Sequence, residues 1–228
     1  MHKQWLPWSS YALCYVLLLP LQAQPNFLQD DFETGLPSHW TQDPLSHMPA
    51  RDFTWIKEAD GNHCLKGLSN ASFAIAGVNQ AFFERPLMVQ EYSVFKWRWK
   101  VSRILDNADA RLKQKDDFAA RFFVVFKKRS WRPRDMRVLI YVWDNQQPRG
   151  TIMDSMWGTG RVKLVVLRNK TTPAGQWATE KRNVYSDFKH AFPKEEPGSV
   201  AAFAIASDTD QTGEAVATFF DDLVIQRD

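Results

Sequence analysis

Apolar and charged side chains alternate strictly in the stretch Phe95-Lys96-Trp97-Arg98-Trp99-Lys100-Val101. Because successive side chains of a strand point to opposite faces, this period of two predicts a strand with one face in a core and the other in solvent. Further runs rich in aromatic and β-branched residues follow along the chain, and such runs are typical of strands. Those runs are residues 118–126, 137–143, 162–167, 200–206 and 223–225.

Local signals elsewhere in the chain agree with a β fold. Asp60-Gly61 lies between apolar segments at 53–57 and 64–68, and this dipeptide favours a tight hairpin. Helical periodicity is scarce, and its best candidate is residues 185–192, which Pro193 ends. Many short strands with few helices predict an all-β fold, an antiparallel β-sandwich of jelly-roll type, rather than alternating β-α units.

The amino-acid composition excludes several classes of protein. The 228 residues include 29 Lys+Arg against 26 Asp+Glu, with 10 Trp and 16 Phe. Such nearly balanced charge and abundant aromatic residues exclude a disordered chain and a histone-like basic protein. The length fits one large domain, and a nucleic-acid partner is not expected.

The N-terminus has the features of a secretory signal. Lys3 precedes an apolar run over residues 12–19, and Leu21-Gln22-Ala23 places a small residue at a cleavage point. These features predict a signal peptide at 1–23 and a single β-sandwich domain at 24–228, exported to the periplasm or secreted. The alternative is a retained anchor, but prolines interrupt the run, which falls short of the roughly 20 apolar residues that span a bilayer. After cleavage no transmembrane segment and only one cysteine, Cys64, would remain, so no internal disulfide is expected.

Acidic residues lie near both ends of the predicted domain. Glu33 follows Asp30-Asp31 at the start, and Asp222 lies in the last predicted strand. Chain ends often lie close together, so Glu33 and Asp222 are expected to share a structural calcium ion. The arrangement resembles jelly-roll carbohydrate-binding modules, in which acids of the first and last strands often hold calcium. The alternative is that both acids are solvated at strand ends, and no other cofactor is required.

A second, weaker metal candidate is the acidic loop that begins at Asp208. Asp208-Thr209-Asp210 followed by Gly213 is similar to the opening of a calcium-binding loop. The similarity then ends, because Phe219 stands at the twelfth loop position, where an EF-hand has glutamate. A hairpin turn held by Asp and Thr side chains is the alternative reading.

Several stretches resemble one bacterial family of exported proteins, catalogued as a domain of unknown function, number 3047. The most specific are Arg182-Asn183-Val184-Tyr185 and Asp208-Thr209-Asp210-Gln211-Thr212-Gly213. The resemblance also includes Trp97-Arg98-Trp99-Lys100-Val101, and it runs from about Asp31 to the C-terminus. It implies a single secreted β-rich domain and brings no activity, substrate or catalytic residue.

The second face of the predicted strands is the candidate ligand site. In 118–127 the even positions are apolar and are expected in the core, which leaves Arg121 on the opposite face. Joined with Tyr141 and Trp143, Arg121 would form a platform on which sugar rings stack. Polar contacts to such a sugar are expected from Arg98, Glu180, Arg182 and Asp187. The alternative is a second buried layer, in which Arg121 pairs with Glu180 or Asp187.

These observations predict a non-catalytic cell-envelope protein that binds glycan. Its expected partner is an envelope glycan or an anionic polysaccharide. One alternative is a polysaccharide-cleaving enzyme, a hydrolase or lyase, that uses the same sheet face and the chain's many acids. Another is a structural or adaptor protein of an envelope assembly. The sequence specifies neither the oligomeric state nor any catalytic residue.

Overall fold

The computed structural model of the protein describes residues 26–41, 52–128, 132–158 and 160–228. The predicted signal peptide at 1–23 lies outside the described residues. Within the described part of the chain, no helix is long and apolar enough to cross a membrane.

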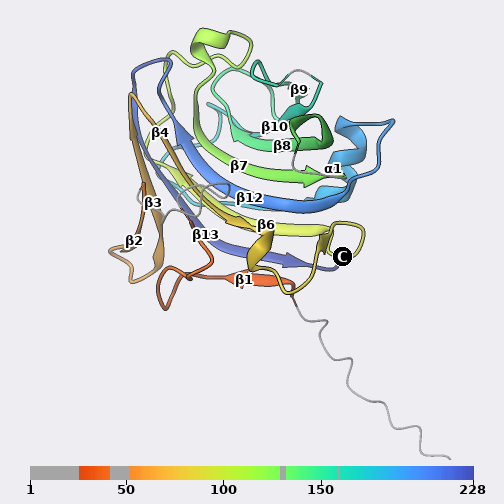
Figure 1. Ribbon diagram of the computed structural model, residues 1–228. Helices are drawn as coiled ribbons and strands as arrows, with labels where there is room; N and C mark the ends of the chain where they lie inside the picture. The colour runs from red at the N-terminus through yellow and green to blue at the C-terminus, as the bar shows by residue number, and fades with distance from the viewer. Residues whose placement is uncertain (1–25, 42–51, 129–131, 159) are drawn as a thin grey trace, which may run out of the picture.

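Two β-sheets stacked on each other make up the described structure (Figure 1). The six-stranded sheet has the order β11 (Ala178–Asn183), β6 (Val94–Val101), β13 (Ala215–Gln226), β3 (His63–Asn70) and β2 (Phe53–Lys57), with β1 (Leu28–Asp30) also paired to β13. The seven-stranded sheet has the order β4 (Phe73–Asn79), β12 (Ser199–Asp208), β7 (Phe118–Lys127), β8 (Met136–Trp143), β10 (Val162–Arg168) and β9 (Ile152–Asp154), with β5 (Leu87–Met88) also paired to β12. The predicted jelly-roll β-sandwich is therefore confirmed.

One strand pair departs from the predicted antiparallel arrangement. β10 runs parallel to β8, whereas the other strand pairs are antiparallel. The chain leaves β8, forms the short strand β9, and returns through a tight turn to add β10 in the same direction as β8. This crossover places the end of β10 at the open edge of the sandwich, opposite β11 of the other sheet.

The core fills the space between the two sheets with aromatic rings. Trp97 of β6 stacks on Phe122 of β7 with ring centroids 4.5 Å apart, and Phe122 in turn lies 6.3 Å from Phe203 of β12. The alternating residues Phe95, Trp97 and Trp99 are all at most 1% exposed, as their periodicity predicts. Burial of such large rings supplies most of the stabilisation of a sandwich this size.

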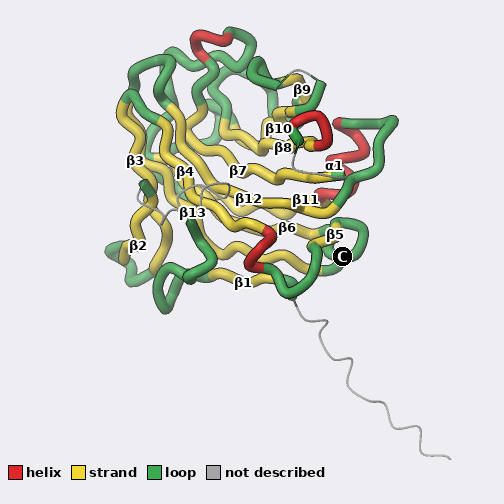
Figure 2. Tube along the Cα trace, in the orientation of Figure 1, coloured by secondary structure: helices red, strands yellow, loops and turns green. Residues whose placement is uncertain are grey.

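Helices are few and peripheral (Figure 2). α1 (Val184–Ala191) confirms the predicted helix within one residue, and the Asn183 side chain caps it by accepting from the backbone N–H of Ser186 at 2.9 Å. Phe188 of α1 packs on Phe126 of β7, with ring centroids 4.8 Å apart. The 3₁₀ turns are η1 (Gln80–Phe82), η2 (Lys113–Lys115) and η3 (Pro133–Asp135).

The hairpin predicted at Asp60-Gly61 is also present. β2 and β3 pair antiparallel on either side of the turn, and Gly61 adopts a φ of 97°, which favours glycine. The remaining predicted strands lie in β6, β7, β8, β10, β12 and β13, with boundaries within a few residues except that β13 starts earlier.

Candidate functional site

The predicted platform of Tyr141, Trp143 and Arg121 is wrong, because these side chains do not share an open face. In the β7–β8 register Phe122 lies opposite Tyr141, whereas Arg121 lies opposite Val142. Directly opposed residues share one face of a sheet, so Tyr141 and Trp143 point into the inter-sheet core and Arg121 points away from it. Tyr141 and Trp143 are only 0% and 1% exposed and present no ring to a ligand.

Two predicted arginines lie on the two outer faces of the sandwich and not with the other candidates. Arg98 of β6 lies on the outer face of the six-stranded sheet, where it pairs with Asp221 at 2.5 Å and Asp222 at 2.9 Å. Arg121 lies on the outer face of the seven-stranded sheet and pairs with Asp208 at 2.7 Å. The pairing of Arg121 with Glu180 or Asp187, which belonged to the alternative of a second buried layer, is therefore also wrong.

Glu180 is the first of two carboxylates that the fold positions at the open edge between the sheets. It lies opposite Trp97 in the β11–β6 register, and so its side chain points inward from the edge strand β11. Its Oε1 accepts from Trp99 Nε1 at 3.0 Å and from Arg168 Nε at 2.5 Å. An indole from the core and a guanidinium from β10 thus fix this carboxylate across the gap between the sheets.

Asp187, at the start of α1, is the second carboxylate. Arg182 donates to both its oxygens, from Nε at 2.9 Å and from a terminal amino group at 2.5 Å, in a bidentate pair. Tyr141 donates its hydroxyl to the same carboxylate at 2.8 Å. The bond to Asp187 raises the pKa of Arg182, and burial together with this carboxylate raises the pKa of Tyr141 well above its usual value. The predicted residues Tyr141, Arg182 and Asp187 therefore meet, and the tyrosine acts as a support from the core.

A pocket opens where these networks reach the surface, and we call it the edge pocket. It has a volume of about 420 Å³ and lies between the end of β10 and the edge strand β11. Its lining residues are Arg149, Gly150, Ile152, Val165, Val166, Leu167, Glu180 and Arg182. Sequence reasoning named Glu180 and Arg182 but missed Arg149, since Pro148-Arg149-Gly150 reads as an ordinary turn and carries no periodic signal.

The acids predicted to hold calcium have other partners in the structure. Glu33 bonds His63 Nδ1 at 2.9 Å, and this bond lowers the pKa of Glu33. Asp222 pairs with Arg98, as described above. Among the described residues, the ligand atoms that converge within 4.8 Å of one another belong to Asp117, Asp208 and Asp210, and not to Glu33 or Asp222.

That acidic group combines the predicted loop with Asp117, which the sequence did not single out as a ligand. The Asp117 carboxylate already accepts from the Thr212 backbone N–H at 2.7 Å and from its hydroxyl at 2.6 Å. Asp208 is paired with Arg121, and burial raises the pKa of Asp208 to about 7. These bonds hold the hairpin turn as the alternative reading expected, and calcium at Asp208 and Asp210 stays a prediction that a chelator titration of the melting temperature tests.

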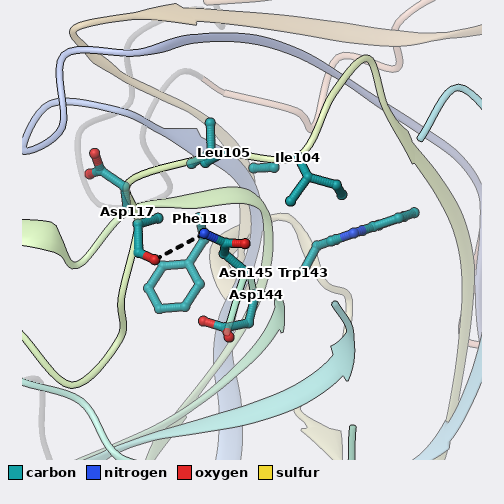
Figure 3. Close-up of a pocket in the computed structure, with 9 residues that line it drawn as sticks. Ile104, Leu105, Asp117, Phe118, Trp143, Asp144 and Asn145 are labelled. Carbon is teal, nitrogen blue, oxygen red and sulfur yellow. Dashed lines mark hydrogen bonds between the residues drawn. The ribbon is translucent and has the colours of Figure 1, made fainter. Parts of the chain in front are cut away.

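Other buried acids surround a hollow at the same end of the sandwich (Figure 3). Asp117 and Asp144 line it beside Phe118 and Trp143, but their carboxylates point in different directions. Burial raises the pKa of Asp144, whose carboxylate accepts from the backbone of Gln146 at 2.6 Å. The hollow leaves no room for a water molecule, so these acids have no access to a substrate.

Comparison with known proteins gives a family and a fold. One protein-family model matches residues 38–224, and its description is protein of unknown function, DUF3047. No curated protein matches the sequence.

Several solved structures are similar to the chain in fold. One, titled cellulose induced protein, Cip1, has a TM-score of 0.50 at 12% identity, covering 87% of this chain and 96% of that one. The family 30 carbohydrate-binding module of a cellulosomal cellulase of Clostridium thermocellum has a TM-score of 0.49 at 10% identity, covering 89% of this chain and 96% of that one. An exo-beta-agarase has a TM-score of 0.44 at 10% identity over 90% of this chain, which spans only 25% of that protein. At 12% identity the likeness to Cip1 shows the sandwich fold alone.

Proposed function

The chain belongs to the DUF3047 family of proteins of unknown function, and from this premise we propose that it binds a saccharide in the edge pocket without cleaving it. The family supplies no activity, so the proposal rests on the pocket. We further propose that the protein acts in the cell envelope, as its predicted signal peptide suggests. The observation that carries the proposal is an open pocket in which rigidly held charged groups face an apolar strand.

The size and lining of the edge pocket suit a sugar. Its volume of about 420 Å³ falls within the range of roughly 300–1,000 Å³ that is usual for small-molecule sites. Ile152, which is 38% exposed, offers apolar surface against which the C–H face of a sugar ring packs, and the buried side chains of Val165 and Leu167 lie behind it. Glu180 and Arg182 offer hydrogen-bonding groups for hydroxyls, and a sugar presents both kinds of surface at once.

The polar groups are positioned before any ligand arrives. Both hydrogen bonds of the Glu180 carboxylate reach Oε1, and in the described part of the chain Oε2 has no hydrogen-bond partner. Because Glu180 lines the pocket, we infer that this oxygen accepts from a ligand hydroxyl there. Arg182 is held by its bidentate pair with Asp187. Such preorganisation limits the side-chain entropy lost on binding.

The same contacts favour binding over catalysis. Glycosidases use one carboxylic acid as a proton donor and a second carboxylate as base or nucleophile. Here Glu180 and Asp187 each bond an arginine, in geometries that hold a guanidinium group in place rather than deliver a proton to a glycosidic oxygen. The acids with raised pKa values, Asp116, Asp144, Asp208 and Asp221, are buried and do not line the edge pocket.

A saccharide screen followed by calorimetry tests this function. We expect saturable binding to at least one oligosaccharide, lost in Ile152→Glu, because this change places a charge on the apolar wall of the pocket. Ile152 is 38% exposed, so the variant should fold normally. Leu68→Glu is the matched control, since Leu68 is 61% exposed and does not line the pocket.

Three outcomes contradict the proposal. The first is the absence of binding to any saccharide, which would favour the structural or adaptor alternative. The second is binding that Ile152→Glu leaves unchanged, which would place the ligand elsewhere. The third is the release of new reducing or unsaturated ends from a bound oligosaccharide, which would show an enzyme.

A further inference from the structure

Charge around the edge pocket is not balanced. Arg182 pairs with Asp187 and Arg168 pairs with Glu180, so two of the arginines at this edge have a carboxylate partner. Arg149 lines the same pocket, and among the described residues no carboxylate lies within ion-pair distance of it. The pocket thus carries one uncompensated positive charge, at a residue that the chain leaves exposed.

The Arg149 guanidinium is nevertheless held in place. Its Nε donates to the backbone carbonyl of Leu167 at 2.9 Å, which ties the side chain to β10. The backbone on either side is also fixed, since Gly150 donates to the carbonyl of Val166 at 2.8 Å. Because the guanidinium is planar, anchoring Nε leaves its terminal amino groups at the pocket in a defined plane.

We propose that the saccharide bound in the edge pocket carries a carboxylate, as a uronic acid does, and that Arg149 binds this group. The inference rests on the proposed function and adds the class of ligand. A guanidinium fork matches the two oxygens of a carboxylate in a bidentate, charge-assisted pair. Arg168 pairs with Glu180 and Arg182 pairs with Asp187. The ligand carboxylate would pair with Arg149, so that the three positive and three negative charges at this edge balance.

Glu180 sets the orientation of such a ligand. Its free Oε2 repels a carboxylate and accepts from a hydroxyl, whereas Arg149 attracts the carboxylate. An acidic sugar therefore binds with its carboxylate toward Arg149 and its hydroxyls toward β11. A neutral sugar lacks the first contact and leaves Arg149 without a partner.

Matched pairs of ligands separate the contribution of the carboxylate from that of the sugar. The probes are oligogalacturonate, mixed oligosaccharides that contain glucuronate, and the carboxyl-reduced neutral form of each. The acid forms are expected to bind about ten- to a hundredfold more tightly than their reduced forms, the gain of one charge-assisted bidentate contact. Sulfated oligosaccharides of similar charge are a further arm, and they should bind less well than the uronates if the planar fork selects a carboxylate.

Variants at Arg149 test whether this residue causes the preference for the acid form. Arg149→Gln should remove the preference for the acid form with only a small decrease in the melting temperature, because the side chain is exposed and loses one hydrogen bond to the Leu167 carbonyl. Arg149→Lys keeps the charge but loses the fork, and should restore only part of the preference. Arg161→Gln is the control for net charge, since Arg161 is exposed and lies beyond the opposite end of β10.

Failure of this inference and failure of the proposed function give different experimental results. Equal affinity for the acid and reduced forms overturns the inference and leaves the proposed function standing. A preference for the acid form that survives in Arg149→Gln overturns the assignment to Arg149. Stronger binding of the sulfated probes overturns the choice of a carboxylate. If no saccharide of either kind binds, the proposed function fails together with this inference.

Discussion

Trp143, the last residue of β8, lies in the core between the two sheets. In sequence it ends an aromatic and aliphatic run and stands where a stacking platform is expected. In the structure it is 1% exposed, and its ring centroid lies 5.8 Å from that of Trp99. Its contribution is therefore to the stability of the core and not to a contact with a ligand.

Replacing Trp143 with alanine should destabilise the fold. Loss of a large buried ring typically costs about 3–5 kcal/mol in the free energy of unfolding, through lost burial and the cavity left behind. Urea denaturation would measure this cost, with Leu68→Ala as a control in which an exposed side chain is shortened. A Trp143→Ala protein of unchanged stability that no longer bound saccharide would restore the ligand role.

Asp116 is a buried acid whose Oδ1 has no hydrogen-bond partner among the residues that the structure describes. Burial raises its pKa from 3.8 to about 6, against the opposing effect of Arg121, and the charges of Asp117 and Asp144 add to the rise. Because the folded state then holds the proton more tightly than the unfolded state, the free energy of unfolding falls as pH rises from about 4 to about 6. The fall is on the order of 3 kcal/mol from this residue.

Asp116→Asn should abolish this part of the pH dependence. The variant carries no charge to desolvate, so its stability relative to the natural protein should increase from pH 4 to pH 7. Urea denaturation of both proteins across that range measures the difference, which cancels the contributions of titrating groups that do not interact with Asp116. Parallel stability curves for the two proteins would show that Asp116 does not titrate in this range.

The sequence predicted strands where one face of the strand is polar. Where both faces are apolar, it did not indicate which face points to the main core. β6 alternates cleanly, so its core residues were identified correctly. In β8, Leu139, Tyr141 and Trp143 face the main core, but Ile140 and Val142 pack with Leu164 and Val166 in a second apolar cluster on the outer face. With both sides buried, periodicity carries no information about which side is open, and only the β7–β8 register decides it.

The candidate site was predictable in part for the same reason. Glu180, Arg182, Asp187 and Tyr141 were predicted from their residue types together with Arg98, Arg121 and Trp143, and the fold brings only the first four to the open edge. Their meeting depends on the pairing of β11 with β6 and on the position of α1, which are long-range features. Arg149 enters from a turn after β8 and reaches the pocket only because β10 runs parallel to β8. No local pattern encodes that crossover.

The edge strand β11 carries a like-charge pair that substitution should relieve. Lys181 lies directly opposite Lys96 in the β11–β6 register, on the outer face. Opposed like charges destabilise a sheet and opposed unlike charges stabilise it, so Lys181→Glu should raise the free energy of unfolding by about 0.2–1 kcal/mol at low salt. Denaturation at low and high salt measures this gain, which should shrink as salt screens the pair.

Lys170→Glu separates the pair from the change in net charge. Lys170 is exposed in a turn beyond β10, so this variant makes the same change of charge without an opposed lysine. An equal gain in both variants would attribute the effect to net charge rather than to the Lys96–Lys181 pair.

One hydrophobic core contains residues from both ends of the described chain. The main apolar cluster extends from Phe32 to Ile225 and takes residues from both sheets. β1 pairs with β13, the last strand, with Leu28 opposite Ile225. α1 closes one end of the same core through Phe188. In the described part of the chain, the inner faces of the two sheets pack directly against each other. Each sheet therefore depends on the other to bury its inner face.

This arrangement predicts a single cooperative unfolding transition. If one sheet unfolded first, Trp97, Trp99 and Phe122 would be exposed to water at a cost of several kcal/mol, more than a small domain usually has to spare. Tryptophan fluorescence, which reports the core, and far-UV circular dichroism, which reports the strands, should therefore give the same urea midpoint. A saccharide at about 100 times its Kd should shift both midpoints together, by about 2.7 kcal/mol of added stability. Separate midpoints would instead identify a part of the sandwich that unfolds on its own, and a ligand-induced shift confined to one probe would locate the edge pocket in that part.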